Sequence, residues 1–155
     1  MPTSTASARL VTPEQFVKHI QTQFGLDLSK PYQGRSPALQ RYTLPLGGLD
    51  HDTVYERDRQ IKVQNLLAAQ AISWEAALYI MDKEKNKAAP TPDQPEWKVR
   101  LQDFFLRIHS RPPTDPEFTF LEERFRKLLE RNVTPSQTWT AVVYILLASV
   151  EFWTL

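Results

Sequence analysis

The residues from Trp139 to Leu155 read WTAVVYILLASVEFWTL, and this stretch decides the fold class. Apolar side chains occur on every side of its helical projection rather than along one stripe. A soluble helix that is apolar all round is normally buried by other elements. The apolar part, 139–150, is shorter than the about 20 residues that a membrane span requires. We therefore expect a buried helix over 139–152, packed inside this chain or against a partner, and no membrane span.

The composition is that of one soluble domain with a substantial core. The chain has 155 residues, of which 41% are hydrophobic, and it includes four Trp, five Tyr and eight Phe. Its formal net charge of +1 provides no bulk attraction to nucleic acid or to an anionic membrane. No cysteine is present, which excludes disulfides, thiolate zinc sites, iron–sulfur clusters and c-type haem attachment. This composition fits a reducing compartment, so we expect a cytoplasmic location.

The first helix has a clear start signal and a clear stop. The sequence TPEQ at 12–15 combines a capping threonine, a proline at the first helical position and a glutamine that can complete a capping box. Apolar residues then recur at helical spacing until Gly25, so a helix is expected over 13–24. Residues 1–11 lack the apolar segment of a secretory signal and are expected to form a flexible leader. The domain is expected to span 12–155.

Further helices follow from the same signals. Helical spacing of apolar residues predicts a long helix at about 52–86 and a third at about 96–110, a fourth capped by Thr114 or Asp115, and a fifth introduced by TPSQ at 134–137. Prolines 90, 92 and 95 mark a surface linker between the second and third. No β-type alternation is sustained anywhere. The expected fold is therefore all-α, a single-domain bundle of about five helices.

A long irregular arm, residues 26–50, separates the first two expected helices. Repeated Pro and Gly leave it without a sustained period, and a connection of this length is often functional or ordered by a partner. It carries five large apolar side chains, at Tyr32, Leu39, Tyr42, Leu44 and Leu46. They favour an arm packed along the chain's own helices. The alternative is an arm that packs partly on another chain.

The sequence carries no catalytic or metal-binding motif. The three histidines, His19, His51 and His109, belong to different elements, and no His-Glu-x-x-His, Glu-x-x-His or Gly-x-Ser-x-Gly pattern occurs. His51 lies between Asp50 and Asp52, a cluster that we interpret as an exposed, capped helix start. No Gly-rich phosphate loop is present. We therefore expect no enzyme, no metal ion and no cofactor.

Two glutamates fall in apolar surroundings. Glu75 lies in the charge-poor middle of the long second helix, and Glu151 lies in the last helix. Buried carboxylates require partners, which the arginines of the C-terminal half could supply: Arg107, Arg111 or Arg124. We expect structural Arg–Glu pairs at these positions rather than catalysis.

Two motifs near the C-terminus resemble a helical module found elsewhere. RPPTDPE at 111–117 opens a helix, and LLASVEF at 146–152 follows about thirty residues later. Residues 105–153 thus resemble the helical C-terminal modules of uncharacterised planctomycete and myxobacterial proteins, in which Arg-x-Pro-Thr-x-x-Glu precedes Leu-Leu-x-Ser-Pro-Glu-Phe. PLGGLD at 45–50 resembles a loop in some of them. Val150 stands where the module has proline, which implies a last helix that need not kink.

The resemblance does not extend to a redox role. Those proteins are often exported and associated with c-type haem domains, whereas this chain has no Cys-x-x-Cys-His motif. The resemblance therefore supports the helical interpretation of the C-terminal third.

The expected function is that of a non-catalytic protein-interaction module or an accessory subunit of a larger assembly, with a protein partner or self-association. Large aromatic side chains are frequent interface anchors. The expected partner-binding residues come from the arm and the C-terminal segment: Tyr32, Leu39, Tyr42, Leu44, Phe152 and Trp153.

Two alternatives rank lower. A small-ligand-binding protein or enzyme would need a pocket between helices, lined by Trp74, Tyr79, Trp97, Phe105 and Tyr144. Nucleic-acid binding would use the arginines of the C-terminal half, but interleaved acidic residues dilute their field.

Overall fold

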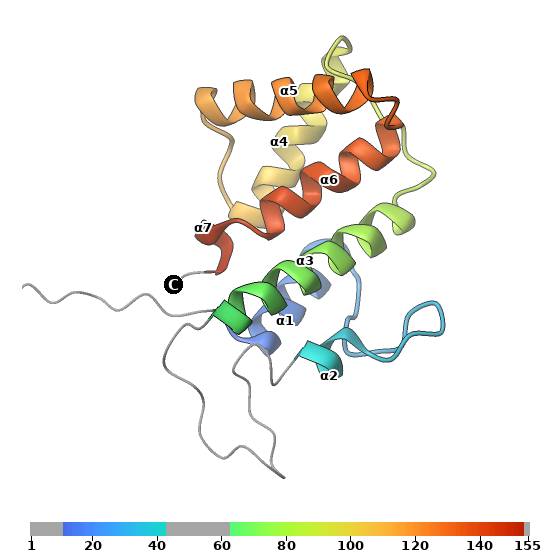
Figure 1. The fold of residues 1–155 in the computed structure, drawn as a ribbon, viewed down its shortest axis with the longest axis vertical. Helices are drawn as coiled ribbons and strands as arrows, with labels where there is room; N and C mark the ends of the chain where they lie inside the picture. Colours follow the sequence, from blue (N-terminus) through green and yellow to red (C-terminus); the bar gives the residue numbers. More distant parts are fainter. Residues whose placement is uncertain (1–10, 43–62, 154–155) are drawn as a thin grey trace, which may run out of the picture.

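The computed structural model describes residues 11–42 and 63–153, and these residues form an all-α fold (Figure 1). In chain order the helices are α1 (Pro13–Phe24), α2 (Ala38–Tyr42), α3 (Val63–Lys83), α4 (Pro95–His109), α5 (Asp115–Glu130), α6 (Pro135–Leu147) and α7 (Val150–Trp153). The described residues contain no strand, only an isolated bridge between Tyr32 and Arg35. The all-α prediction is confirmed, and the five long helices correspond to the five expected from sequence.

Several expectations concern residues that lie outside the described ranges. They include residues 1–10 of the expected leader, the His51 cluster, Leu44 and Leu46, and the first turns of the expected 52–86 helix. Val11, the last residue of the expected leader, is described and is buried. Within the described ranges, α1 has the bounds expected from sequence, and α4 differs from its expected bounds by one residue at each end. The arm is less irregular than expected, because residues 38–42 form α2.

Three helices begin with the same reciprocal cap. In α1, the Thr12 hydroxyl accepts a hydrogen bond from the Gln15 backbone N–H, and the Gln15 side chain accepts one from the Thr12 N–H at 2.8 Å. Each such box satisfies two N–H groups that a helix start leaves without an intrahelical partner. The same arrangement opens α5 and α6, through the pairs Thr114–Glu117 and Thr134–Gln137.

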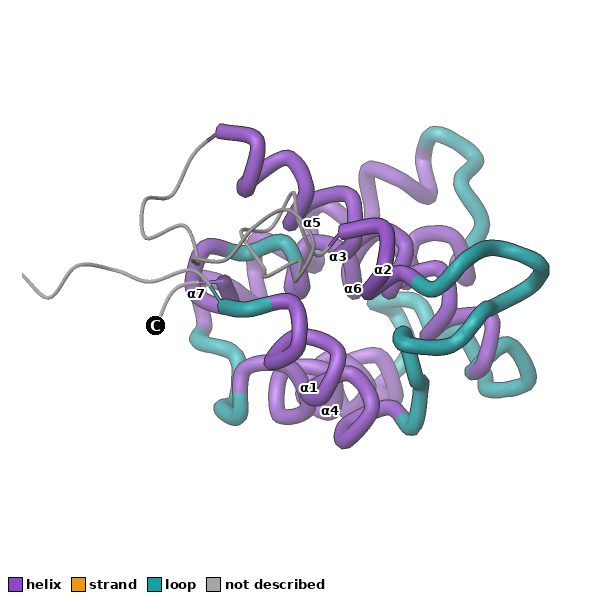
Figure 2. The backbone as a smooth tube through the Cα atoms, turned by 90° about the horizontal axis from the view of Figure 1, so that it is seen from below, coloured by secondary structure: helices purple, strands orange, loops and turns teal. Residues whose placement is uncertain are grey.

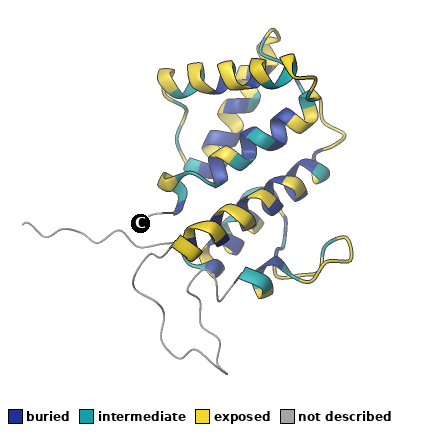
Figure 3. Ribbon diagram, in the orientation of Figure 1, coloured by how far each residue is buried: buried dark blue, intermediate teal, exposed yellow. Residues whose placement is uncertain are grey.

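Helices α3 and α6 run side by side through the middle of the molecule (Figure 1). Helix α6 also packs against α4 and α5 on its other sides, which explains why its sequence is apolar nearly all round. In Figure 3 most of α6 is coloured as buried, whereas α5 and part of α3 show broad exposed faces. Helix α1 lies beside α4, as the tube view in Figure 2 shows.

Cationic side chains from two neighbouring helices cap the end of α1. Gly25 terminates α1 in the left-handed region, with φ of 63°. The Lys83 ammonium of α3 donates to the carbonyls of Phe24 at 3.0 Å and of Gly25 at 2.7 Å. The Arg107 guanidinium of α4 donates to the Gln23 carbonyl at 2.9 and 3.1 Å. Both charges lie at the negative end of the α1 dipole, so they fix α1 against α3 and α4.

The last helix is broken where the sequence predicted continuity. A single helix was expected over 139–152, but α6 ends at Leu147 and α7 begins at Val150. The Leu147 carbonyl accepts hydrogen bonds from the Ser73 hydroxyl of α3 at 3.1 Å and from the Trp153 indole N–H at 2.7 Å. These donors occupy the carbonyl that a continuing helix would use for its own next turn. The break is therefore imposed by tertiary contacts, although no proline stands at position 150.

Substitution of a buried leucine of α6 tests whether this helix lies at the centre of the core. Leu147 is fully buried and Leu146 nearly so. We expect Leu147→Ala to lower the free energy of unfolding by about 2–5 kcal/mol, through lost apolar contact and a residual cavity. Ile145→Ala, two residues away and more exposed, is the matched control and should cost much less. Urea denaturation followed by circular dichroism would measure both, and equal losses would contradict a buried α6.

Candidate functional site

The described part of the arm packs along α3 of its own chain. The Tyr32 hydroxyl donates to Asp82 of α3 at 2.6 Å, and its ring lies 4.2 Å from that of Tyr79. The hydrogen bond to the Asp82 carboxylate, together with burial, raises the pKa of Tyr32 to about 12. Leu39 and Tyr42 are partly buried against the core. These contacts agree with an arm that packs along the chain's own helices.

Arg41 of α2 is the partner of Glu75. Its guanidinium makes a bidentate pair with the Glu75 carboxylate, which also accepts a hydrogen bond from Tyr79. Burial opposes ionisation of Glu75, but the hydrogen bonds from Arg41 and Tyr79 outweigh it and hold its pKa below the usual value. The expectation that Glu75 pairs with Arg107, Arg111 or Arg124 is wrong, because α2 places an arginine of the arm against the middle of α3.

Trp153 belongs to the chain's own core, which corrects its expected role as a partner anchor. It is 2% exposed and stacks on Phe16 of α1, with ring centroids 4.8 Å apart. Its indole N–H is bonded to Leu147, and its carbonyl accepts the Val11 N–H at 2.8 Å. A side chain with all these internal contacts has no surface left for another protein. Phe152 remains half-buried at the surface.

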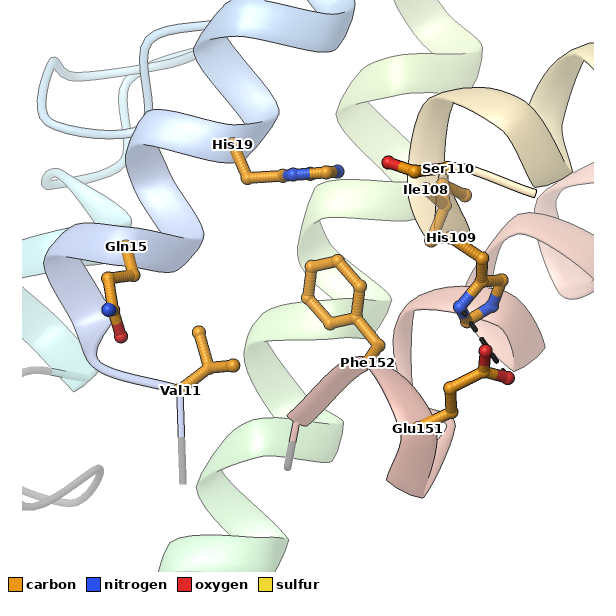
Figure 4. Close-up of a pocket in the computed structure, with 8 residues that line it drawn as sticks. All are labelled: Val11, Gln15, His19, Ile108, His109, Ser110, Glu151 and Phe152. Carbon is orange, nitrogen blue, oxygen red and sulfur yellow. Dashed lines mark ion pairs between the residues drawn. The ribbon is translucent and has the colours of Figure 1, made fainter. Parts of the chain in front are cut away.

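Phe152 lies at an open cleft between α1, α4 and α7 (Figure 4). The cleft has a volume of about 350 Å³. His19 extends into it from α1, and His109 lies on its far side beside Glu151. The Phe152 ring lies between them, with its centroid 5.2 Å from that of His19 and 6.4 Å from that of His109. The remaining lining residues are Val11, Gln15, Ile108 and Ser110.

Burial keeps both imidazoles of the cleft neutral near neutral pH. The His109 side chain is only 3% exposed, and burial lowers its pKa although Glu151 Oε2 lies 4.0 Å from Nδ1. Burial likewise lowers the pKa of His19, more than its hydrogen bond to the Arg107 carbonyl at 2.9 Å raises it. The sequence placed the two histidines in separate elements and gave no signal of their convergence.

Arg111 joins three elements beside this cleft. Its guanidinium makes bidentate contacts with Glu117 of α5, at 2.7 and 2.9 Å, and with Glu151 of α7, at 2.7 and 2.8 Å. The hydrogen bonds from Arg111 lower the pKa of Glu117 to about 2, against the opposing effect of its partial burial. The expectation of a structural Arg–Glu pair at Glu151 is confirmed, with Arg111 as the partner, but the expected burial of Glu151 is wrong, because its side chain is 50% exposed.

A second surface feature lies on α3. Its outer side, here called the α3 face, comprises Val63, Gln64, Leu66, Leu67, Gln70, Ala71, Trp74 and Leu78, all exposed. Between Val63 and Met81 the single charged residue is Glu75, which is buried. Exposure reaches 61% at Leu67 and 45% at Trp74. The Trp74 ring packs edge-to-face against Tyr144 of α6, with centroids 5.3 Å apart, so its orientation is fixed.

The aromatic residues expected to line a common pocket are distributed over the fold instead. Trp97 belongs to an aromatic cluster with Phe125 and Trp139, and Phe105 is buried in α4. Tyr79 contacts the arm, whereas Trp74 and Tyr144 meet at the surface of α3 and α6.

No protein-family model matches the chain, and no curated protein or solved structure is similar enough to count as a match. Across 11–42 and 63–153, no three His, Asp or Glu side chains are grouped so that they could hold a metal ion. None of the helices in the described part of the chain combines the length and apolar content needed to cross a membrane.

Because Trp153 is internal, its removal is expected to lower the stability of the isolated protein. We expect Trp153→Ala to lower the free energy of unfolding by about 3–5 kcal/mol, because it removes a buried indole and its hydrogen bonds. Val150→Ala, at an exposed position on α7, provides the control. Chemical denaturation should show the loss in the isolated protein. Unchanged stability of Trp153→Ala would contradict the packing described here.

The lowered pKa values of the two cleft histidines predict that the free energy of unfolding decreases in mild acid. Their pKa values are depressed in the folded state, so the unfolded chain takes up protons first as the pH decreases. The stability contributed by the neutral imidazoles is complete above about pH 6.5 and is lost as the pH falls through the lower, folded-state pKa values. Urea denaturation between pH 7.5 and 5.5 should show this decline. The double variant His19→Asn, His109→Asn should show a flatter profile, and an unaltered slope would rule out these groups as the cause.

Proposed function

We propose that this chain is a non-catalytic protein-interaction module that binds its partner through the α3 face. The observation that carries the proposal is a long helix side with exposed leucines and a tryptophan and with no charged side chain. Contiguous apolar patches on soluble proteins commonly mark interaction sites. Helix α3 is held from its other side by α6 and by the arm, so it presents this face on a rigid support.

We expect Trp74 to contribute more to the binding free energy than any other residue of the α3 face. Tryptophan is over-represented among interface residues whose removal costs the most affinity. Its contact with Tyr144 restricts the ring before binding, which reduces the conformational entropy lost on association. Leu78 lies one turn and Leu67 two turns away on the same side, so the three side chains form one stripe, with Gln70 and Ala71 between Leu67 and Trp74.

This proposal keeps the interaction role expected from sequence but assigns it to a different surface, the α3 face instead of the arm and the C-terminal segment. Tyr32, Leu39 and Tyr42 pack partly on their own chain, and Trp153 is internal. Phe152 and the exposed parts of the arm residues remain candidate secondary contacts. A cytoplasmic location belongs to the same proposal and is supported by the absence of cysteine.

The cleft supports a second candidate function, the binding of a small molecule. Its volume of about 350 Å³ lies within the range of ligand sites, and it combines an apolar floor at Phe152 with polar groups from His19 and Gln15. A metabolite screen by thermal shift would test it. A ligand bound there should raise the melting temperature of the wild type, but not that of His19→Phe.

The interaction function is tested by charge placed on the α3 face. We expect the tagged wild-type chain to retain specific proteins from an extract of its native host, identified by mass spectrometry, and Leu67→Glu to lose them. Leu106→Glu is the matched control, because Leu106 is also a helical leucine and is 53% exposed, but on α4. Circular dichroism would verify that both variants fold. Retention of the same proteins by Leu67→Glu would overturn the α3 face as the binding surface.

A further inference from the structure

We infer that the partner of the α3 face is a second copy of this chain, and that two α3 helices pair antiparallel about a two-fold axis between Gln70 and Ala71. This inference rests on the proposed function and adds the identity of the partner and its register. It follows from the order of residues along the face, from its lack of charge and from its size.

The large residues of the face are placed symmetrically about its midpoint. Leu67 and Trp74 stand equally far on either side of the point between residues 70 and 71, and so do Val63 and Leu78. With a rise of about 1.5 Å per residue, the inner pair lies about 5 Å from that point and the outer pair about 11 Å. A two-fold axis through the point therefore sets Leu67 against Trp74 of the second copy, and Val63 against Leu78.

This register pairs residues of complementary size. Each bulky Trp74 meets a leucine rather than another tryptophan, so both copies can approach along the whole stripe. At the centre, Gln70 lies over Ala71 of the second copy, a long side chain beside a small one. Helices separated by small residues can pack with their axes about 8–10 Å apart. The same patch on both copies then forms an isologous interface, the commonest form of homodimer.

The absence of charge favours self-pairing over a charged partner. In a homodimer each face meets itself, so any charge on it would lie near its own copy and repel it. Glu75, the one charge between Val63 and Met81, is buried and paired with Arg41 away from the face. The α3 face thus has no like-charge cost when two copies meet, and it has no charge with which to select an acidic or basic partner.

The size of the face fits a small but specific dimer. From their exposed fractions, the five apolar side chains Val63, Leu66, Leu67, Trp74 and Leu78 offer roughly 500 Å² per copy, or roughly 1,000 Å² for two, near the lower bound of biological interfaces. The glutamines, Ala71 and Tyr144 of α6 extend this area at the rim. We therefore expect a dimer that dissociates on dilution.

The register can be tested with complementary charges. Sedimentation of the full chain at high micromolar concentration should show a dimer for the wild type and monomers for Leu67→Lys and for Trp74→Glu. An equimolar mixture of these two variants should form a heterodimer, because Lys at 67 of one copy then faces Glu at 74 of the other. Leu106→Lys, on the exposed side of α4, should remain dimeric.

Cysteine crosslinking provides an independent readout, since the natural chain has no cysteine. The double variant Leu67→Cys, Trp74→Cys should form covalent dimers under a mild oxidant. Leu67→Cys alone should not, because the two copies of residue 67 lie about 10 Å apart along the antiparallel axes. Efficient crosslinking of Leu67→Cys alone would exclude the antiparallel register.

The outcomes separate this inference from the function on which it rests. A monomeric wild type, or a dimer unaffected by both charge variants, overturns the self-pairing. If the wild type is monomeric but Leu67→Lys still loses proteins bound from host extract, the interaction function stands with a different partner. If Leu67→Lys neither changes the oligomeric state nor loses bound proteins, both proposals fail.

Discussion

The carbonyl of Leu147 is the point on which the arrangement of the described helices depends. It accepts hydrogen bonds from Ser73 in the middle of α3 and from the indole of Trp153 in α7. Because the carbonyl is buried, loss of these donors would leave a polar group without partner in an apolar environment. The same contact ends α6, turns the chain back into α7 and places Trp153 against Phe16 of α1. One shared acceptor thus determines how α1, α3, α6 and α7 meet.

Local signals made much of this fold predictable from sequence, and the failures at Leu147 and Glu75 involve distant residues. The TPEQ start and Gly25 specify both ends of α1 because caps act within a few residues. The break after Leu147 could not be predicted, because the serine that helps cause it lies 74 residues earlier. Glu75 was assigned the wrong arginines for the same reason, since its true partner belongs to an arm with no sequence period. For Glu151 the true partner, Arg111, was one of the three arginines expected from sequence, although 40 residues separate the two.

The candidate sites also divide into features that local sequence indicates and features that depend on distant residues. The histidine cleft depends on the position of α7 beside α1 and α4, and no sequence pattern predicts that position. The α3 face is visible in the sequence as a charge-poor segment, but the sequence does not say which side of that segment the other helices cover. The structure divides the segment into a side that faces α6 and a side that faces solvent.

The two sides of α3 differ in residue size as well as exposure. The buried side carries four alanines, Ala68, Ala69, Ala76 and Ala77, together with Ile72, Tyr79, Ile80 and Met81, whereas the exposed apolar residues are Val63, three leucines, Trp74 and a single alanine. Small residues toward the core let α6 approach closely, and among the outer residues Trp74 also contacts α6, through Tyr144. Substitutions on the outer side can therefore accumulate over evolutionary time at little cost to folding. A lineage could change the outer side of α3 without having to rebuild the scaffold that presents it.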